Sequence, residues 1–340
     1  MSKKIKWDTI GIVITNLNYE KKKDELIEIN NNREWLKNIY FKHTIDWNGY
    51  KSTSSDISVS YYILYNFLNI DIDIIDIENI SKKRFENSSL VFFLIYDLLE
   101  SFHNNNFSTH KYITNVLKNS KNLYPPYKYQ KYINNKCNYY EDMKKKKINI
   151  ANSFCLDRKS LKKKNIFNIL QQKIKKELTT KENLSFICKP ILGQESKGFK
   201  KFEKFNKDEL NLYLIEQFLK YPGIIFQEYV PGFDKAVLES RVFYCGDNYQ
   251  YTILTSDKGG WVPKEEGGKK ASKNLEKVKK LSKNIINKLP KIVINKKILP
   301  KLLTRIDISC CTNNKMFVNE IEFVPSLYMD LKPKNLIDKK

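Results

Sequence analysis

The chain has 340 residues, with 61 lysines and arginines against 38 aspartates and glutamates and a formal net charge of +23. This length allows two or three domains. The longest apolar run, residues 90–99, contains Asp97 and is too short to span a bilayer, so we expect no membrane segment. The basic excess is compatible with a polyanionic partner. However, the whole chain is rich in Lys, Asn and Ile, and its lysines occur in short runs typical of a solvated surface.

The positions of the cysteines and histidines limit which catalytic and metal-binding groups the chain can offer. The six cysteines show no CxxC spacing, which predicts neither a disulfide framework nor a zinc ribbon and favours a reducing, cytoplasmic location. No histidine follows His110, so the C-terminal two thirds offer no histidine base or histidine-ligated metal. Any chemistry in that part must therefore use carboxylates, lysines, arginines and a hard metal ion.

The first 120 residues are expected to alternate strands and helices. Hydrophobic periodicity predicts strands at 7–15 and 71–80, helices at 20–39 and 57–68, and a strand running into a helix over 88–102. This alternation is typical of a small α/β domain with a parallel sheet. Residues 124–126 interrupt the pattern and are predicted to form a linker.

A second block of elements begins near Tyr127. The same patterns predict helices at 134–143, 165–178, 207–219 and 271–289, strands at 148–154, 184–191, 223–230, 302–310 and 315–323, and a hairpin over 239–255. Nine of the eleven glycines lie between residues 193 and 268. This clustering favours backbone turns and close ligand approach there, and residues 253–270 are predicted to form a polar loop.

Acidic residues on the last two predicted strands form the strongest chemical signal. Alternate residues of a strand share a face, so Arg305 lies beside Asp307, and Glu320 beside Glu322. Three carboxylates among apolar neighbours are costly to bury unless a hard divalent cation binds them. The alternative interpretation is a pair of strands whose acidic faces simply point to water.

Two earlier segments have features of a nucleotide site. A strand ending at Lys189 leads into a loop from Gly193 through Ser196 to Gly198, where backbone N–H groups and a hydroxyl could bind phosphate. An ordinary hairpin loop is the alternative, because neither P-loop nor dinucleotide spacing is present.

The other segment, residues 224–234, is a strand that ends in a Pro-Gly turn. The backbone of Glu228 and Val230 would meet the adenine edge and Asp234 the ribose, with Gln227 and Tyr229 in the same segment. A strand leading into a plain type II turn is the alternative.

Together these motifs resemble the ATP-grasp superfamily, and the last strands are similar to the D-alanine–D-alanine ligase pattern, R-[IV]-D followed by E-x-N and Pro. The spacing of thirteen residues from Asp307 to Glu320 matches that pattern, and Pro325 falls in register. Lys136 matches an earlier lysine of the family and Lys189 its central lysine. The chain departs from the pattern at Glu322, which replaces Asn, at Ser326, which replaces Gly, and at Asn135, which replaces Asp.

The resemblance implies an α/β (α+β) ATP-grasp fold with an N-terminal domain at 1–125, a central subdomain at 126–222 and a C-terminal subdomain at 223–340. It implies an ATP-dependent ligase that activates a carboxylate as an acylphosphate for attack by an amine or similar nucleophile. Lys136 and Lys189 would hold phosphates, Asp307, Glu320 and Glu322 one or two Mg²⁺ (Mn²⁺ being an alternative), and Arg241 and Arg305 the transferring phosphoryl group. The 253–270 loop would serve as a lid, and related folds are often homodimers.

Other functions are compatible with the same residues. An ATP-grasp kinase acting on an anionic small molecule such as an inositol phosphate would also suit the basic charge. A basic nucleic-acid-binding protein is less favoured, since the sequence has no RNA-recognition, zinc-finger or helix-turn-helix signature. A nucleotide-binding scaffold without activity is disfavoured by the retained lysines and carboxylates.

Overall fold

The computed structural model describes residues 9–14, 45–47, 50–52, 70–77, 80–93, 107–193, 197–230, 238–255, 261–263, 269–310 and 316–323. It divides into two units. The first comprises residues 1–130 together with 292–299, and the second comprises 131–291 together with 300–340. The helices predicted at 20–39 and 57–68 lie outside the described residues. Among those described, no helix is both long enough and apolar enough to cross a membrane.

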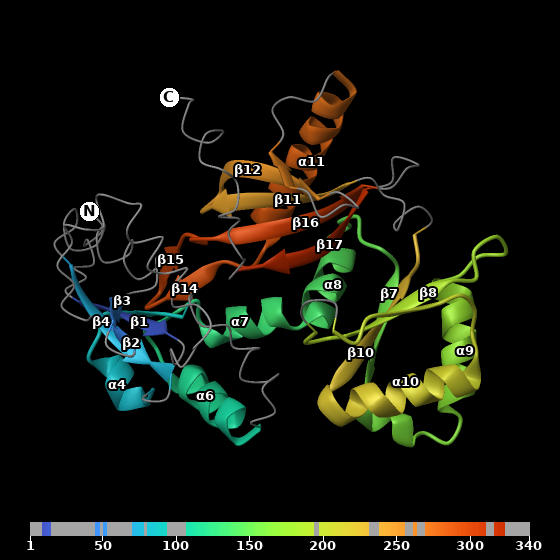
Figure 1. Ribbon diagram of the computed structural model, residues 1–340, viewed down its shortest axis with the longest axis horizontal. Helices are drawn as coiled ribbons and strands as arrows, with labels where there is room; N and C mark the ends of the chain where they lie inside the picture. Colours follow the sequence, from blue (N-terminus) through green and yellow to red (C-terminus); the bar gives the residue numbers. More distant parts are fainter. Residues whose placement is uncertain are drawn as a thin grey trace. The chain divides into compact units, whose positions relative to one another are not determined.

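The first unit contains the predicted parallel sheet, in the order β4-β1-β5-β6 (Figure 1). Its strands are β1 (Thr9–Ile14), β4 (Asp71–Asp76), β5 (Leu90–Phe92) and β6 (Leu123–Tyr124). Helices α4 (Lys82–Glu86) and α6 (Phe107–Asn119) accompany the sheet, and Phe85, Val91 and Leu117 are among the side chains of its buried core. Two short hairpins complete the unit, β2 (Ile45–Trp47) with β3 (Tyr50–Ser52) and β14 (Ile292–Ile294) with β15 (Lys297–Leu299).

The structure refines two predictions for this unit. Residues 90–92 of the predicted strand at 88–102 form β5, and a further strand, β6, pairs with it. The predicted linker at 124–126 begins inside β6: Tyr124 ends that strand, and Pro126 directly precedes helix α7 (Tyr127–Asn134), where the Pro126 carbonyl accepts the first helical hydrogen bonds. Proline fixes φ and suits this position before a helix, so a breaker in the sequence marks a tight strand-to-helix turn.

The second unit begins with a four-stranded antiparallel sheet in the order β7-β10-β8-β9. The strands are β7 (Ser153–Asp157), β8 (Phe186–Pro190), β9 (Lys200–Phe202) and β10 (Gly223–Glu228), so β7 begins later than the predicted strand at 148–154. Helices α9 (Ile166–Glu177) and α10 (Lys207–Lys220) cover one face of it, after the short 3-10 helix η3 (Arg158–Lys162) (Figure 1). Alternate residues of β10, Ile224 and Phe226, point into the core beneath both helices, as side-chain alternation along a strand requires, and Ile225 between them is also buried.

A five-stranded antiparallel sheet, ordered β13-β12-β11-β16-β17, follows in the same unit. Its strands are β11 (Leu238–Cys245), β12 (Asn248–Thr255), β13 (Trp261–Pro263), β16 (Thr304–Cys310) and β17 (Met316–Glu322). Helix α11 (Lys269–Lys288) packs on it, with a hydrogen bond of 2.9 Å between the Tyr244 and Ser282 hydroxyls. The 253–270 segment is therefore not a continuous loop, since Trp261–Pro263 extends the sheet edge beyond β12. Lys258 and Lys264, two lysines of the segment that the family resemblance implies as a lid, lie outside the described residues.

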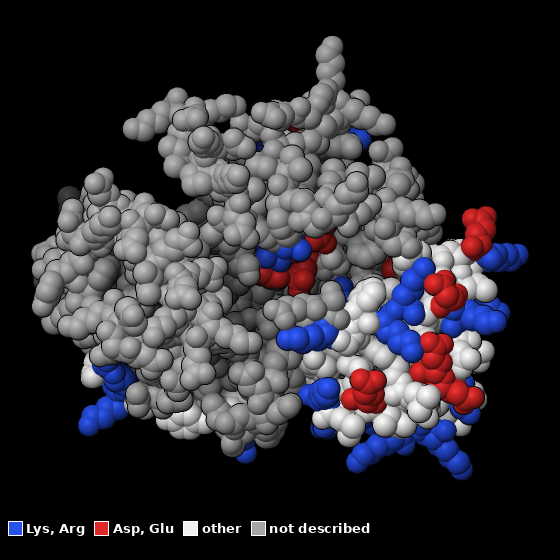
Figure 2. All heavy atoms as spheres, in the orientation of Figure 1, with Lys and Arg blue, Asp and Glu red and all other residues white. Residues whose placement is uncertain are grey.

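Charges on the surface of α9 and α10 are mixed in sign, and Figure 2 shows basic and acidic side chains interspersed there. Lys200 pairs with Glu209 at 2.9 Å, and Lys201 with Glu203 at 3.1 Å. On this part of the surface the lysines therefore do not form an uninterrupted basic face.

Candidate active site

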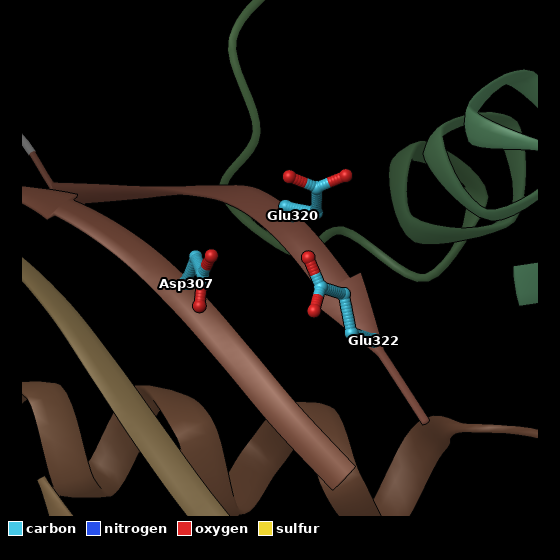
Figure 3. Close-up of side chains that lie close together, drawn as sticks. All are labelled: Asp307, Glu320 and Glu322. Atoms are coloured by element: carbon cyan, nitrogen blue, oxygen red, sulfur yellow. The ribbon is translucent and has the colours of Figure 1, made fainter. Parts of the chain in front are cut away.

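The three predicted metal ligands meet on neighbouring strands. In the antiparallel register of β16 and β17, Asp307 lies opposite Glu320 and Arg305 opposite Glu322. One carboxylate oxygen from each of the three acids lies within 4.8 Å of the others, and Figure 3 shows them close together. Asp307 is only 2% exposed, whereas both glutamates remain partly accessible.

A β-bulge shapes this cluster. The register shifts after Asp307, so that Ile308 pairs with Val318 and Asn319 is left as the extra residue on β17. A bulge redirects side chains relative to simple alternation. Asn319 consequently reaches the site beside Glu320, where it donates to Glu239 Oε2 at 2.8 Å and accepts from Lys189 Nζ at 3.5 Å.

The two predicted arginines lie beside the carboxylates. Arg305, 5% exposed, donates Nε–H and Nη2–H to the two oxygens of Asp307 at 2.8 and 2.9 Å, and Nη2–H also to Glu322 at 2.7 Å. Arg241 on β11 lies opposite Asp307, with Nε 3.2 Å from Glu239 and 3.8 Å from Asp307. Each arginine thus neutralises carboxylates through hydrogen bonds, and Arg305 does so in a forked geometry that lysine cannot reproduce.

The two predicted phosphate lysines come from different elements. Lys136 is the first residue of α8 (Lys136–Lys145) and pairs with Glu320. Lys189 lies on β8, with Nζ 3.5 Å from the Tyr140 hydroxyl and 5.5 Å from the centre of its ring. Helix α8 starts at this point because the Asn135 side chain caps it, accepting the Cys137 N–H at 3.0 Å.

Burial and neighbouring charges shift the titration of these groups. Burial raises the pKa of Asp307 to about 7 and that of Glu322 to about 8, with Arg305 acting in the opposite direction in both cases. Burial also acts to raise the pKa of Glu320, but Lys136, Lys189 and Arg305 together outweigh it and the net shift is downward. Burial, assisted by the positive charge of Lys136, lowers the pKa of Lys189 to about 8. Among the described residues, four acids (Glu239, Asp307, Glu320, Glu322) here face four bases (Lys136, Lys189, Arg241, Arg305).

The predicted adenine segment follows β10. Gln227 is buried, and its Oε1 has no hydrogen-bond partner among the described residues. The Glu228 N–H donates to the Asn152 carbonyl at 2.8 Å, and the Tyr229 carbonyl accepts from Asn183 at 2.7 Å. Val230 is packed with Ala151 and Phe317. These backbone groups at Glu228 and Tyr229 thus already have protein partners, and Asp234 lies outside the described residues.

The predicted phosphate loop is described only at its two ends, because Ser196 lies outside the described residues. Gly193 N–H donates to the Pro190 carbonyl at 3.1 Å. Gly198 has φ +74°, and a Cβ there would overlap Pro190 as well as Gln217, so the position favours glycine. The Gly198 carbonyl accepts from the Tyr213 hydroxyl at 2.7 Å, which fixes this end of the loop to α10.

Three residues of the site were missed by the sequence analysis. Glu239 lies two residues before Arg241 on a strand, so alternation alone places both on one face. Tyr140 lies four residues after Lys136 on a helix, the spacing that brings side chains together. Asn319 had no such signal, because only the bulge brings it to the site.

The donor set fits a hard divalent cation. Three carboxylates whose oxygens lie within 4.8 Å of one another provide the oxygen ligands that Mg²⁺ prefers. They also lie in the same unit as two lysines and two arginines that can contact phosphate oxygens. The arrangement is therefore suited to binding a magnesium–polyphosphate complex.

A disulfide joins the helix that carries Lys136 to the neighbouring sheet. Cys137, the second residue of α8, is bonded to Cys155 on β7, with Cα atoms 6.2 Å apart. The sequence analysis predicted no disulfide framework and did not foresee this single bond, because the absence of a CxxC motif says nothing about cysteines that the fold brings together. Of the other described cysteines, Cys188 is buried and Cys245 exposed, and both are thiols.

Reducing this disulfide is expected to destabilise the protein. The bond closes a loop with a sequence separation of 18, for which chain entropy predicts a loss of about 3 kcal/mol. Thermal denaturation with and without a reducing agent measures the effect, and the melting temperature should fall by several degrees. The Cys137→Ser/Cys155→Ser double variant is the control and should not respond to reductant. Equal melting of the oxidised and reduced wild type would contradict the expectation.

Comparison with known proteins identifies the fold. D-cycloserine synthetase DcsG superposes with a TM-score of 0.55 at 12% identity, covering 94% of this chain and 92% of that chain. VanG D-Ala:D-Ser ligase from Enterococcus faecalis gives 0.53 at 12% identity over 94% and 90%, and D-alanine–D-alanine ligase from Bacillus anthracis complexed with ATP gives 0.51 at 13% over 93% and 86%. No family model matches the sequence. No curated protein sequence matches it either.

These structural similarities establish the fold of the chain. The chain has the ATP-grasp fold, as the resemblance of its sequence motifs implied. At 12% to 13% identity the similarity defines the fold alone.

Proposed function

We propose that this protein is an ATP- and Mg²⁺-dependent ligase that activates a carboxylate as an acylphosphate for attack by an amine or a similar nucleophile. The observation that carries the proposal is the carboxylate cluster of Asp307, Glu320 and Glu322 on an ATP-grasp fold. The ion pair of Lys136 with Glu320 supports the proposal, because it brings a lysine ammonium group, which can bind phosphate, to the same cluster. The solved structure of the similar D-alanine–D-alanine ligase was determined with ATP, which supports ATP as the nucleotide.

Each group has a role in this proposal. Asp307, Glu320 and Glu322 hold the cation, which when bound supplies positive charge to the phosphate oxygens. Lys136 and Lys189 bind phosphate oxygens, and Arg241 and Arg305 offset negative charge around the transferring phosphoryl group. The substrate carboxylate oxygen attacks the γ-phosphorus and ADP leaves. The nucleophile then attacks the carbonyl carbon, loses its proton, and displaces inorganic phosphate.

Stabilisation by Mg²⁺-ATP is the first expected result. At a ligand concentration about a hundredfold above Kd, binding to the folded state adds roughly 2.7 kcal/mol to the free energy of unfolding. Thermal denaturation should therefore shift upward for wild type, and the shift should largely disappear in Glu320→Gln. Glu182→Gln, at an exposed position in the same unit, is the control and should respond like wild type. A wild type that does not respond to millimolar Mg²⁺-ATP would remove the basis for the proposed site.

Trapping the acylphosphate with hydroxylamine distinguishes the ligase interpretation from the kinase interpretation. An acylphosphate reacts with hydroxylamine to give a hydroxamate and phosphate, whereas a phosphorylated alcohol does not. Incubation with ATP, candidate carboxylates and hydroxylamine should therefore give ADP together with a hydroxamate. ADP release that produces a stable phosphorylated product without hydroxamate would support the kinase instead.

A further inference from the structure

One of the two predicted phosphate lysines lies against a predicted metal ligand. Lys136 forms an ion pair with Glu320, which belongs to the carboxylate cluster shown in Figure 3. The lysine is 9% exposed, so its charge needs a nearby anion, and Glu320 provides it. A divalent cation at the same carboxylate would be repelled by the ammonium group, because both carry positive charge. The ion pair and a bound cation therefore compete for Glu320.

The backbone around Lys136 is held at three successive residues. The Asn135 side chain caps α8, the Lys136 N–H donates to the Ile191 carbonyl at 3.1 Å, and Cys137 is bonded to Cys155. The lysine side chain, in contrast, is a flexible four-carbon stem. The ammonium group can therefore change its partner while the backbone of the helix stays in place.

A phosphate-binding segment begins close to this fixed point. Ile191, whose carbonyl accepts the Lys136 N–H, directly follows β8 and lies two residues before Gly193, where the predicted phosphate loop starts. Lys136 thus has the carboxylate cluster at its side chain and the start of the loop at its backbone. A phosphate oxygen, which forms charge-assisted hydrogen bonds with ammonium groups, is the alternative partner in that direction.

Lys189 has contacts of a different kind. Its Nζ lies 3.5 Å from the Tyr140 hydroxyl and 3.5 Å from Asn319 Oδ1, and both of these oxygens are neutral. A phosphate that replaces them breaks no ion pair. Lys136, however, has to leave Glu320 before it can bind phosphate. The two lysines of the site are therefore not equivalent.

We propose that Lys136 exchanges partners when ligands bind: it pairs with Glu320 in the absence of a metal–nucleotide complex and moves to a phosphate oxygen when that complex binds, which releases Glu320 for the cation. The inference rests on the proposed function, since the nucleotide brings the phosphate. Phosphate and cation then favour each other's binding, because each removes one partner from the same ion pair. A divalent cation alone binds weakly, because no anion draws the lysine away from Glu320.

Removing the charge of Lys136 should strengthen the binding of a cation alone. Mn²⁺ is the probe, because the electron paramagnetic resonance signal of the free ion disappears on binding and so reports the free concentration. Binding that is lost in Asp307→Asn is assigned to the carboxylate cluster. At this site Lys136→Met should bind Mn²⁺ about tenfold more tightly than wild type. Lys136→Arg keeps the charge and should bind Mn²⁺ as wild type does.

The same substitution should have the opposite effect on Mg²⁺-ATP. Lys136→Met loses a contact with phosphate, so we expect isothermal titration calorimetry to show Mg²⁺-ATP binding weakened by about tenfold. A substitution that merely disturbed the structure would weaken the binding of both ligands. Opposite changes in the two affinities are therefore specific to an exchange of partners.

Two further lysine variants are the controls. Lys189→Met removes a nearby charge that is held by neutral oxygens, and should tighten Mn²⁺ binding clearly less than Lys136→Met does. Lys181→Met, at an exposed position in the same unit, should leave Mn²⁺ binding unchanged. Circular dichroism confirms that each variant is folded. An equal gain in Lys189→Met would overturn the role of the contact with Glu320.

The measurement separates this inference from the function on which it rests. If wild type binds Mn²⁺ at the carboxylate cluster and Lys136→Met binds it no more tightly, the exchange is wrong and the proposed ligase is unaffected. If no Mn²⁺ binding is lost in Asp307→Asn, the carboxylates are not a metal site, and the exchange and the proposed function are both overturned.

Discussion

Lys189→Met is expected to stabilise the nucleotide-free protein by about 3 kcal/mol at pH 7 while abolishing its stabilisation by Mg²⁺-ATP. The folded protein lowers the pKa of Lys189 from 10.5 to about 8, mainly through burial, and each pKa unit corresponds to about 1.4 kcal/mol. In the absence of an anionic ligand, the charged form of Lys189 therefore lowers the free energy of unfolding. Methionine fills similar space beside the Tyr140 ring without carrying charge.

The pH dependence gives this prediction a definite sign. Between pH 8 and 10.5 the unfolded chain keeps a proton that folded Lys189 has lost, so wild-type stability rises with pH across that window. The loss of stability caused by burying the charged Lys189 is fully present below pH 8 and disappears above pH 10.5. The advantage of Lys189→Met should therefore be constant below pH 8 and fall towards zero by pH 10.5.

Urea denaturation at several pH values measures the difference in unfolding free energy. Lys181→Met, at an exposed position in the same unit, is the control and should change stability little at any pH. A Lys189→Met protein that is less stable than wild type at pH 7 would contradict the electrostatic argument. Retention of the full Mg²⁺-ATP shift by that variant would contradict the role of Lys189 in phosphate binding.

The parts of the site that follow local periodicity were predictable from sequence. Alternation along β16 and β17 placed Asp307, Glu320 and Glu322 in one cluster, and the register of the two strands confirms this. The same rule would have added Glu239, because it precedes Arg241 by two residues. Helical spacing would likewise have added Tyr140 to Lys136. These contacts depend only on geometry within one element.

Contacts made through irregular or distant structure could not be predicted in the same way. Asn319 enters the site because the strand is bulged, and alternation puts it on the wrong face. The bond between Cys137 and Cys155 joins a helix to a strand, and no local pattern specifies that pairing. In the first unit, Tyr124 belongs to a strand of only two residues, too short for a periodic signal and hidden by the prolines that follow.

Glu322 replaces the asparagine of the ligase pattern, and the structure shows what its additional carboxylate contacts. The additional carboxylate accepts a hydrogen bond from Arg305, which also donates Nε–H and Nη2–H to Asp307. Asparagine at this position would not offer Arg305 a negative charge. The extra acid therefore belongs to a charge-balanced network, and the stability of that network depends on the arginine.

Arg305→Met is accordingly expected, above pH 8 where Asp307 and Glu322 are ionised in the wild type, to lower the free energy of unfolding by about 3–5 kcal/mol in the absence of metal. Removing one member of a buried ion pair leaves the other uncompensated, and that penalty exceeds the worth of the pair itself. Asp307, 2% exposed, would keep the Arg241 contact at 3.8 Å as its ion pair among the described residues. The effect should be smaller when Glu322→Gln is present as well, because one of the two carboxylates is then neutral.

Magnesium should partly reverse the loss. If Asp307, Glu320 and Glu322 bind a divalent cation, that cation supplies the positive charge that Arg305→Met removes. Mg²⁺ alone should then raise the melting temperature of the variant more than that of wild type. Arg158→Met, which changes an exposed arginine of the same unit, is the control and should respond to Mg²⁺ as wild type does. Wild-type stability in Arg305→Met would show that the network contributes little. A strongly destabilised variant that Mg²⁺ does not rescue would instead count against the carboxylates as a metal site, without any measurement of enzymatic activity.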